Sequence, residues 1–364
     1  MEERDYWLAF SQVRGLGMVR FRKLLAHFGS LTEAWSASPL AFSSAGLNKK
    51  VIEQILAVRS RLEVESLQAD LASKHISFLI WKDAAYPKSL LQIEQPPPVL
   101  YYRGTLLEED HLAVAIVGTR NMTSYGRQLT KDTAEYLAGN GVTIVSGLAR
   151  GVDAIAHQAA LDVGGRTFAV LGSGVDVIYP PEHRQLSENI LRNGAILSDY
   201  APGTQPDGIN FPPRNRIISG LSLATVVIEA GEKSGALITA RFALEQGREV
   251  FAVPGSVLSP MSRGTNGLLA SGATPMTNPT QVLEFLRLPR SERVPAAEEL
   301  VLDEDESRIL HLLGQDSLHI DEICHRLDLS IEKLTVQLTM MELKGLVERE
   351  NGMEYHAVQR WDHP

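Results

Sequence analysis

Short apolar runs alternate with amphipathic segments through the middle of the chain. Six of these runs have the length and the β-branched composition of buried strands: Ala113–Val117, Thr143–Val145, Thr167–Leu171, Ala195–Ser198, Thr225–Ile228 and Glu249–Val253. Between them lie segments with helical spacing or helix-capping residues, such as Ser124–Asn140 and Ser234–Gln246. Strands that are apolar throughout and separated by helices form parallel sheets covered on both faces. The pattern therefore predicts a doubly wound α/β core over residues 111–288.

The segment before this core, residues 1–110, is predicted to be a helical domain. It contains the turn Val13-Arg14-Gly15-Leu16-Gly17, followed by residues with helical spacing. A Gly-x-Gly turn before a helix is typical of helix-hairpin-helix and SAM-like modules, in which free N–H groups at the helix start face a DNA phosphate. Arg20, Arg22 and Lys23 would lie near that phosphate. A small helical bundle with a glycine turn explains the same residues equally well.

The C-terminal part of the chain has the element order of a winged-helix domain. After residues 289–302, a linker rich in Pro, Ala and charge, the pattern predicts helices at Asp305–Leu313, His319–Leu327 and Ile331–Gly345. A β-hairpin over Val347–Val358, with Asn351-Gly352 as its turn, follows them. We therefore expect a winged-helix-like domain over residues 303–364.

The net charge of −9 is concentrated at the C-terminal end. Residues 303–364 carry 6 basic and 14 acidic side chains, whereas residues 112–288 carry 14 of each. A local basic groove on the neutral core is compatible with this distribution. The third predicted helix of the winged-helix-like domain has only Lys333 and Lys344, against Glu332 and Glu342. We expect that domain to be a protein-contact or regulatory module, and we do not expect it to recognise duplex DNA.

The composition narrows the class of protein. The single cysteine, Cys324, forms neither an intrachain disulfide nor a thiolate zinc cluster. No set of His, Asp and Glu residues has metal-ligand spacing, so neither a metal nor a cofactor is expected. No apolar run approaches the roughly 20 residues that span a bilayer, and the charged N-terminus has no apolar signal segment behind it. We therefore expect a cytoplasmic protein without membrane contact.

Glycine-rich turns follow the predicted strands. They are Gly118-Thr119-Arg120, Ser146-Gly147, Gly172-Ser173-Gly174, Lys233-Ser234-Gly235 and Pro254-Gly255-Ser256. In an open α/β sheet such turns lie together at the carboxyl ends of the strands, where ligands bind. Glycine lets the backbone approach an anion closely, and free N–H groups at helix starts bind it. Several such turns on one edge predict a phosphate-binding rim.

Cations and an aromatic side chain accompany this rim. Arg120 and Lys233 lie in its turns, and the segment Phe211-Pro212-Pro213-Arg214-Asn215-Arg216 precedes the fifth predicted strand. Arginine side chains bind phosphate oxygens with two parallel hydrogen bonds, and Phe211 offers a face on which a base stacks. A phosphate-binding surface with an aromatic platform is typical of single-strand binding.

These motifs resemble the signature of the DNA-processing protein A (DprA/Smf) family. The similar segments are Gly118-Thr119-Arg120 and residues 146–157, 211–216, 234–240 and 254–255, in the family's order. The resemblance implies a Rossmann-like core that binds incoming single-stranded DNA during natural transformation, protects it and helps to load the RecA recombinase. It also implies a homodimer formed through the Rossmann-like domain. No bond is broken in this function, so no catalytic residue is expected.

The expected DNA-binding residues combine the rim with this resemblance. They are Gly118, Thr119, Arg120, Ser146, Gly147, Phe211, Arg214, Asn215, Arg216, Lys233, Ser234 and Gly235. A structural explanation exists for three of them: Arg214 and Arg216 would pair with Asp199, Glu229 or carbonyl groups at strand ends, and Lys233 would belong to a solvated turn. The position on the rim and the preceding Phe-Pro-Pro segment favour DNA binding for both arginines.

The main alternative is an enzyme that hydrolyses or transfers a nucleotide or nucleoside phosphate at the same rim. Ser146, Asp153 and His157 would form its site, which requires the serine hydroxyl to meet the imidazole. Because His157 lies more than two helical turns beyond Ser146, we do not expect this contact. We instead expect Asp153 to be the N-cap of a helix over Ala154–Leu161, and His157 to be a hydrogen-bonded structural histidine.

Three further classes fit the sequence less well. Nucleoside phosphate-ribohydrolases of this architecture carry a Pro-Gly-Gly-x-Gly-Thr run with a catalytic Glu, whereas Pro254-Gly255-Ser256 lacks the second glycine and the glutamate. Dinucleotide-binding dehydrogenases carry Gly-x-Gly-x-x-Gly after the first strand, and Gly118-Thr119-Arg120-Asn121 does not have that spacing. A protein-interaction hub with a core that has lost its ligand is disfavoured by the retained glycines and arginines.

Overall fold

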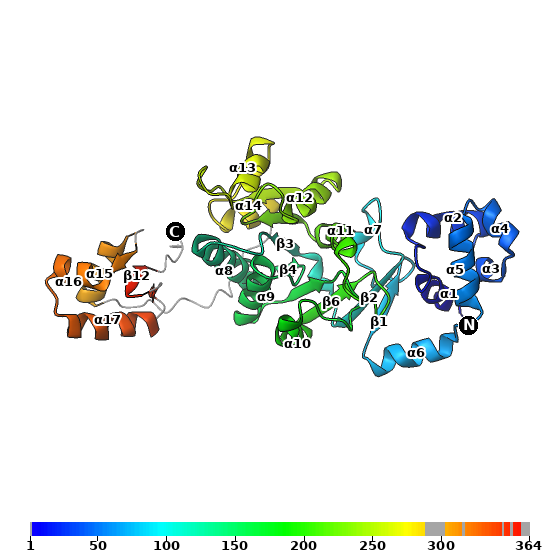
Figure 1. The fold of residues 1–364 in the computed structure, drawn as a ribbon, viewed down its shortest axis with the longest axis horizontal. Helices are drawn as coiled ribbons and strands as arrows, with labels where there is room; N and C mark the ends of the chain where they lie inside the picture. Colours follow the sequence, from blue (N-terminus) through cyan, green and yellow to red (C-terminus); the bar gives the residue numbers. More distant parts are fainter. Residues whose placement is uncertain (1, 288–302, 315–316, 344–345, 350–351, 358–364) are drawn as a thin grey trace. The chain divides into compact units, whose positions relative to one another are not determined.

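A computed structural model describes residues 2–287, 303–314, 317–343, 346–349 and 352–357 of the chain (Figure 1). The chain forms two compact units, Met1–Glu292 and Arg293–Pro364. The predicted linker, residues 289–302, lies outside the described residues. None of the helices in the described ranges combines the length and the apolar character that a membrane span requires.

Within the described residues, a nine-stranded sheet runs through the first unit (Figure 1). Its spatial order is β1-β2-β6-β5-β4-β3-β7-β8-β9. The bounds are β1 Ser77–Ile80, β2 Val99–Gly104, β3 Ala113–Val117, β4 Thr143–Ser146, β5 Thr167–Val170, β6 Gly194–Ser198, β7 Ala224–Val227, β8 Glu249–Ala252 and β9 Thr274–Pro275. Neighbouring strands from β6 to β9 are parallel. All six predicted strands are present with ends that differ by at most one residue, so the doubly wound core is confirmed.

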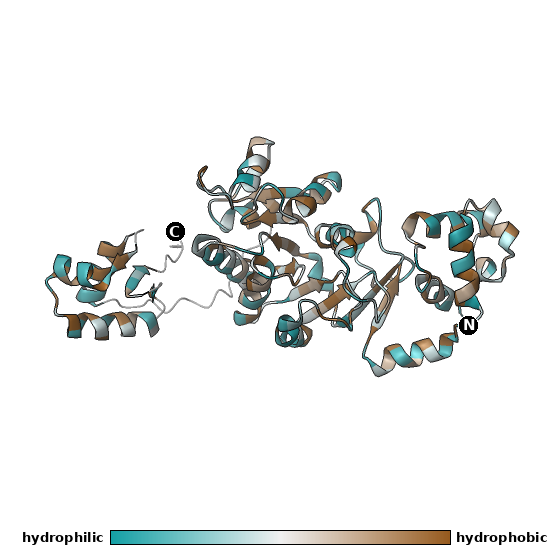
Figure 2. Cartoon of the chain, viewed as in Figure 1, coloured by the Kyte–Doolittle hydropathy of each residue, from teal (hydrophilic) through white to brown (hydrophobic). Residues whose placement is uncertain are grey.

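Helices cover both faces of this sheet, and consecutive residues of its central strands are therefore all buried. Val114 and Ile116 of β3 pack with α8 and α9 on one face, whereas Ala115 and Val117 pack with α11 and α12 on the other. Figure 2 shows the strands as the most hydrophobic part of the unit. The helices of this region are α7 Lys88–Leu91, α8 Ser124–Gly139, α9 Val152–Asp162, α10 Arg184–Arg192, α11 Phe211–Leu221, α12 Ala236–Glu245, α13 Arg263–Ala270 and α14 Thr280–Leu286.

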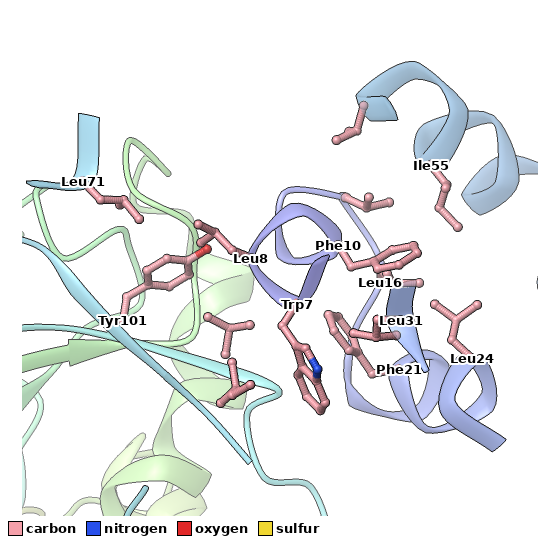
Figure 3. Close-up of a cluster of buried hydrophobic side chains, with 14 of the residues drawn as sticks. Trp7, Leu8, Phe10, Leu16, Phe21, Leu24, Leu31, Ile55, Leu71 and Tyr101 are labelled. Carbon is pink, nitrogen blue, oxygen red and sulfur yellow. The ribbon is translucent and has the colours of Figure 1, made fainter. Parts of the chain in front are cut away.

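A helical region precedes the sheet and shares a hydrophobic core with it. Its helices are α1 Glu3–Ser11, α2 Met18–Phe28, α3 Leu31–Ser36, α4 Pro39–Ser44, α5 Lys49–Arg59 and α6 Val64–Ser73. Trp7 packs edge-to-face against Trp81, with ring centroids 5.3 Å apart. Figure 3 shows Leu8 of α1 pointing toward Tyr101 of β2, in the same buried cluster. The hydroxyl of Tyr101 also lies 2.5 Å from Ser11 Oγ and accepts a hydrogen bond from Gln12 Nε2. These contacts fix α1 on the sheet.

The segment 1–110, predicted as a helical domain, also supplies the two antiparallel strands of the sheet. β2 pairs with β1 on one side and with β6 on the other. The prolines before β2 form a rigid connection, since the carbonyl of Pro97 accepts hydrogen bonds from Trp81 Nε1 and from the Tyr86 hydroxyl, both at 2.8 Å. These two strands have no α/β alternation around them, so the apolar pattern does not distinguish them from loop segments.

The second unit contains the predicted winged-helix arrangement. Its elements are α15 Glu304–Leu313, β10 Leu318–His319, α16 Ile320–Leu327, α17 Ile331–Leu343, β11 Val347–Arg349 and β12 Glu354–Ala357. The three helices enclose Ile309, Ile323 and Leu338, all fully buried. The hairpin of β11 and β12 is confirmed, and the two-residue β10 adds an unpredicted third strand beside β12. Gly345, Asn351 and Val358, which belong to the predicted elements, lie outside the described residues.

Candidate nucleic-acid interface

A hollow opens at the point where the strand order of the sheet reverses. From β3 the chain proceeds through β4 and β5 to β6, and it then returns to place β7 on the opposite side of β3. The loops that follow β3 and β7 therefore diverge, which is where open α/β sheets bind their ligands. The two loops are tied together at their base, because the amide of Thr119 donates a hydrogen bond of 2.7 Å to the carbonyl of Glu229.

Nine of the twelve predicted residues line this hollow, which we name the switch cleft. They are Gly118, Thr119, Arg120, Phe211, Arg214, Asn215, Lys233, Ser234 and Gly235. The cleft has a volume of about 780 Å³. Ser146, Gly147 and Arg216 are not among its lining residues. Residues from three separate segments of the chain thus meet in one place, as expected for the carboxyl edge of a parallel sheet.

Two cations in the switch cleft are available to a ligand. The side chains of Arg120 and Lys233 are exposed and form no ion pair with any residue that the structure describes. The backbone amides of Arg120, Lys233 and Gly235 also have no acceptor among the described residues. Free N–H donors and unpaired cations on facing loops make the upper part of the cleft suitable for phosphate oxygens.

The buried carboxylate of Glu229 fixes the loop that carries Arg120. It accepts hydrogen bonds from the amide of Thr123 (2.9 Å) and from the Thr123 hydroxyl (2.7 Å). Thr123 in turn is the N-cap of α8, since its hydroxyl accepts a hydrogen bond from the amide of Gly126. A side chain at Gly126 would meet Glu229 at 2.2 Å. The carboxylate therefore occupies space that only glycine leaves open.

Arg214 lies in the floor of the switch cleft and is only 5% exposed. Its guanidinium donates hydrogen bonds to the carbonyls of Gly147, at 2.9 Å, and Val170. Burial lowers the pKa of Arg214 to about 10, against the opposing effect of Asp153, so the group stays charged at neutral pH. Two of its donors are thus committed to strand ends, as in the structural explanation, while its charge contributes to the field in the cleft.

Arg216 follows the structural explanation. Its Nη2 donates a hydrogen bond of 2.8 Å to Asp199 Oδ2, and only 12% of its side chain is exposed. It lies two residues beyond Arg214 on α11 and therefore points to another side of that helix. The structure does not bring Arg216 into the switch cleft.

Asp153 organises the loop after β4, and the prediction that it is an N-cap is wrong. Its carboxylate accepts hydrogen bonds from the amides of Gly147 (3.1 Å) and Ala149 (3.3 Å). α9 begins at Val152, two residues before the predicted start at Ala154, so Asp153 lies inside the helix. Its N-cap is Gly151, with a φ of +79°. Glycine is required there, because a Cβ would lie 2.3 Å from the carbonyl oxygen of Thr119. Burial raises the pKa of Asp153, and the nearby Arg214 opposes that shift.

His157 is a structural histidine, as predicted. The ring is fully buried; its Nε2 accepts from the amide of Leu148 (3.3 Å), and its Nδ1 lies 2.7 Å from Thr167 Oγ1. Burial, with the charges of His183 and Arg214, lowers the pKa of His157 to about 3, so the ring is neutral. Ser146 Oγ donates its proton to the carbonyl of Ile116 at 2.6 Å. The hydroxyl–imidazole contact that a hydrolase requires is thus absent among these described residues.

A second aromatic side chain, missed in the sequence, accompanies Phe211. Tyr179 lines the switch cleft, and its ring centroid lies 5.6 Å from that of Phe211 at an angle of 35°. Tyr179 is 42% exposed, which leaves part of its ring accessible to a base. A usable signal is present: Tyr179-Pro180-Pro181 repeats the aromatic-Pro-Pro pattern of Phe211-Pro212-Pro213.

No cluster of three or more metal-ligating side chains occurs in the described part of the chain. The lining of the switch cleft is consistent with this result, since Asp153 is its sole carboxylate among the described residues and is bonded to two backbone amides. Three positive side chains against one engaged carboxylate leave the cleft electropositive. Its chemistry suits an anionic chain carrying aromatic bases.

Comparison with known proteins gives consistent matches over both units. Residues 77–287 match the family model described as DNA recombination-mediator protein A, and residues 292–353 match the DprA winged helix domain. Protein Smf of Synechocystis sp. is 38% identical over 97% of this chain and 98% of its own length. DNA processing protein DprA of Bacillus subtilis is also 38% identical, over 74% of this chain and 94% of its own.

Two solved structures are similar at both sequence and fold level. DNA processing protein A from Streptococcus pneumoniae superimposes with a TM-score of 0.67 and 34% identity, covering 77% of this chain and 97% of that protein. DNA processing protein A from Helicobacter pylori, described with a unique single-stranded DNA binding mode, gives a TM-score of 0.54 and 35% identity. That match covers 59% of this chain and 97% of the Helicobacter protein.

Proposed function

Because this chain belongs to the DNA recombination-mediator protein A (DprA/Smf) family, we propose that it binds single-stranded DNA in the switch cleft and breaks no bond. The observation that carries the proposal is the meeting of Arg120 and Lys233, both unpaired within the described residues, above the charged floor formed by Arg214. The Helicobacter relative, which binds single-stranded DNA, supports this assignment of ligand.

The cleft offers a separate contact for each part of a nucleotide chain. Arg120, Lys233 and the free amides beside them bind the phosphates, whereas the ring pair of Tyr179 and Phe211 receives a base. Stacking on an aromatic ring is available only to a base that is not already enclosed in a duplex. Phosphate contacts and stacking are both tolerant of sequence, so we expect binding that depends little on base identity.

The wider role follows from the family. In this proposal the protein acts in the cytoplasm during natural transformation, protects the incoming strand and helps to load the RecA recombinase. It does so as a homodimer formed through the Rossmann-like core. Sedimentation of the full chain with and without an oligonucleotide tests the dimer, and strand exchange by RecA on pre-coated single strands tests the loading role.

The enzyme alternative loses its support because its proposed groups are engaged elsewhere. Ser146 is bonded to Ile116, Asp153 to two amides and His157 to Leu148 and Thr167. A thermal-shift comparison separates the two functions. A stabilisation by oligo(dT) and none by mononucleotides supports the DNA carrier, whereas a marked stabilisation by mononucleotides supports the enzyme.

The direct test is an anisotropy titration of a dye-labelled oligo(dT) over a salt series with Arg120→Ala/Lys233→Ala. For single strands, each lost phosphate contact reduces the magnitude of the slope of log affinity against log salt by about 0.7. The slope of the double variant should therefore be smaller in magnitude than that of the wild type by about 1.4. Lys131→Ala/Arg192→Ala, two exposed cations on α8 and α10, is the matched control. An unchanged slope in the first variant, with the fold intact, would refute the proposed site.

A further inference from the structure

A second group of cations lies in the helical region, where two turns repeat the same local structure. Gly15-Leu16-Gly17 precedes α2, and Gly46-Leu47-Asn48 precedes α5. The first glycines have φ values of +84° and +80°, and both leucines are buried. Gly17 and Asn48 then occupy the N-cap positions of their helices, both with a φ of −80°. The region therefore contains two equivalent hairpins, of which the sequence motif revealed only the first.

The two hairpins enclose a continuous depression. It consists of two hollows that share Arg20 and Asn48, and the larger has a volume of about 520 Å³. We name it the hairpin groove and define it by Arg14, Gly17, Arg20, Lys23, Asn48 and Lys50. Both helix starts thus open on the same depression.

The charge in the hairpin groove is of one sign. Four cations line it, and no Asp or Glu does so among the described residues. Arg20 donates to the carbonyl of Gly15 and Lys23 to that of Gly46, so both are held at the groove. None of the four forms an ion pair with a residue in the described ranges.

Carboxylates are nevertheless available in the same region. Of its nine cations outside the groove, four are matched by a carboxylate: Arg4 by Asp83, Lys49 by Glu53, Lys74 by Asp70 and Lys82 by Glu3. Residues 1–111 carry 13 basic and 13 acidic side chains, so the region is neutral as a whole. A neutral region that segregates four unpaired cations into one depression concentrates positive potential there.

Backbone donors reinforce that potential. The amides of Met18 and Val19, in the first turn of α2, have no acceptor among the described residues. Gly17 has no side chain that could cap them. In α5 the Asn48 side chain satisfies only the amide of Val51. Four cations and the free N–H groups of two helix starts offer more donors than a single small anion can occupy, which favours a chain of phosphates as the ligand.

We propose that the hairpin groove binds the sugar-phosphate backbone of duplex DNA. Its lining includes no aromatic side chain, in contrast to Tyr179 and Phe211 in the switch cleft. Single-strand sites gain much of their affinity from base stacking, which this groove does not offer. A duplex presents its phosphates and encloses its bases, and it is therefore the ligand that fits. The protein would hold a single strand in its core and an adjacent duplex on its helical region.

The test uses the full chain and three dye-labelled probes: a duplex, oligo(dT) of the same length, and a duplex with a single-stranded tail. Lys23→Glu/Lys50→Glu changes two exposed side chains of the groove. Lys131→Glu/Arg192→Glu is the control with the same change in net charge. We expect the groove variant to lower duplex affinity roughly tenfold or more and to reduce the salt slope by about 1.8, while oligo(dT) affinity stays within about twofold.

The outcomes separate this site from the switch cleft. Arg120→Ala/Lys233→Ala should lose oligo(dT) binding and retain duplex binding, and the tailed probe should be weakened by both variants. The inference is overturned if the wild-type chain does not bind the duplex, or if the control variant weakens duplex binding as much as the groove variant. It is also overturned if the groove variant weakens oligo(dT) as much as duplex, because the groove would then belong to the single-strand path. Equal melting temperatures of the variants exclude unfolding as the cause.

Discussion

The amide of Thr119 donates a hydrogen bond of 2.7 Å to the carbonyl of Glu229, across the point where the strand order reverses. Arg120 follows the first residue directly, and Lys233 lies four positions beyond the second. The bond therefore sets the separation of the two cations that we assign to phosphate binding. The Glu229 side chain adds a second link, through Thr123, to the start of α8. The position of Arg120 thus depends on a buried residue that does not line the switch cleft.

Glu229→Gln should weaken single-stranded DNA binding although Glu229 does not line the switch cleft. The amide side chain has one acceptor oxygen in place of two, so it leaves a donor of Thr123 unsatisfied and places an NH₂ group beside it. We expect a loss of about 1–3 kcal/mol in the free energy of unfolding, measured by urea titration, together with reduced oligo(dT) affinity. Glu232→Gln, in the same loop but exposed, should leave the free energy of unfolding unchanged and should not weaken oligo(dT) binding. Equal losses in both variants would argue against positioning by Glu229.

Gly147→Ala should disturb the floor of the switch cleft. A Cβ at this position would lie 2.6–2.8 Å from three atoms of the Arg214 guanidinium, which is held by two carbonyls and has little room to move. We expect destabilisation by about 1–3 kcal/mol and weaker oligo(dT) binding. Gly139→Ala, at the end of α8, meets nothing within 4 Å. It should be neutral or slightly stabilising, and a destabilisation as large as that of Gly147→Ala would contradict the explanation.

The central fold was predictable because its signals are local. Runs such as Ala113–Val117 are buried at every position, and α8 begins at a side-chain cap, Thr123. The strands β1 and β2 gave no such signal. Their pairing is antiparallel and, for β2 with β6, joins residues nearly a hundred positions apart. Whether the residues of β2 are strand or loop is decided by that distant partner, and β1 in turn depends on β2.

The candidate site was predictable in its location and less so in its side chains. Strand ends identify the edge of the sheet, so Arg120 and Lys233 were placed correctly in one cleft. The directions of Arg214 and Arg216 depend on their rotation about α11, and the carbonyls and carboxylate that hold them come from other segments. No pattern in residues 211–216 encodes those partners. Tyr179 is the opposite case, since the aromatic-Pro-Pro pattern of residues 179–181 repeats that of residues 211–213 and lies in the sequence itself.

Tyr179→Ala and Phe211→Ala should each weaken binding of a single strand. A base stacked on an aromatic ring contributes about 1–3 kcal/mol, so we expect losses of roughly fivefold to a hundredfold in oligo(dT) affinity. Tyr179→Phe keeps the ring and should retain binding. Duplex affinity should be unaffected by any of the three, because a duplex does not present its bases for stacking. An oligo(dT) affinity that is insensitive to both alanine variants would exclude the ring pair as the platform.

Removing the winged-helix unit should leave single-strand affinity unchanged. Residues 303–364 carry 6 basic and 14 acidic side chains, and Lys333 on α17 is paired with Asp305 at 2.6 Å. A chain ending at residue 302 should therefore bind oligo(dT) within about twofold of the full chain at 0.15 M salt, and slightly more tightly at low salt, where repulsion is less screened. A large loss of affinity in anisotropy titrations would show instead that this unit contacts DNA.

The neutral state of His157 should make stability depend on pH. Burial lowers its pKa from 6.5 to about 3, so between these values the unfolded chain binds a proton that the folded chain does not. The contribution of the neutral ring to the free energy of unfolding is therefore complete above pH 6.5. It is lost progressively as the pH falls toward 3, by about 1.4 kcal/mol per pH unit at the limit of one proton. The measurement compares the wild type with His157→Gln. The pKa of Asp153 is raised by burial, which makes stability change with pH in the opposite direction, but Asp153 is present in both proteins. The advantage of the wild type over the variant in free energy of unfolding should therefore shrink steadily between pH 7 and pH 5 in urea titrations. If the two pH profiles are parallel, the imidazole titrates alike in the folded and unfolded chains, and the buried neutral ring is not what supports the loop after β4.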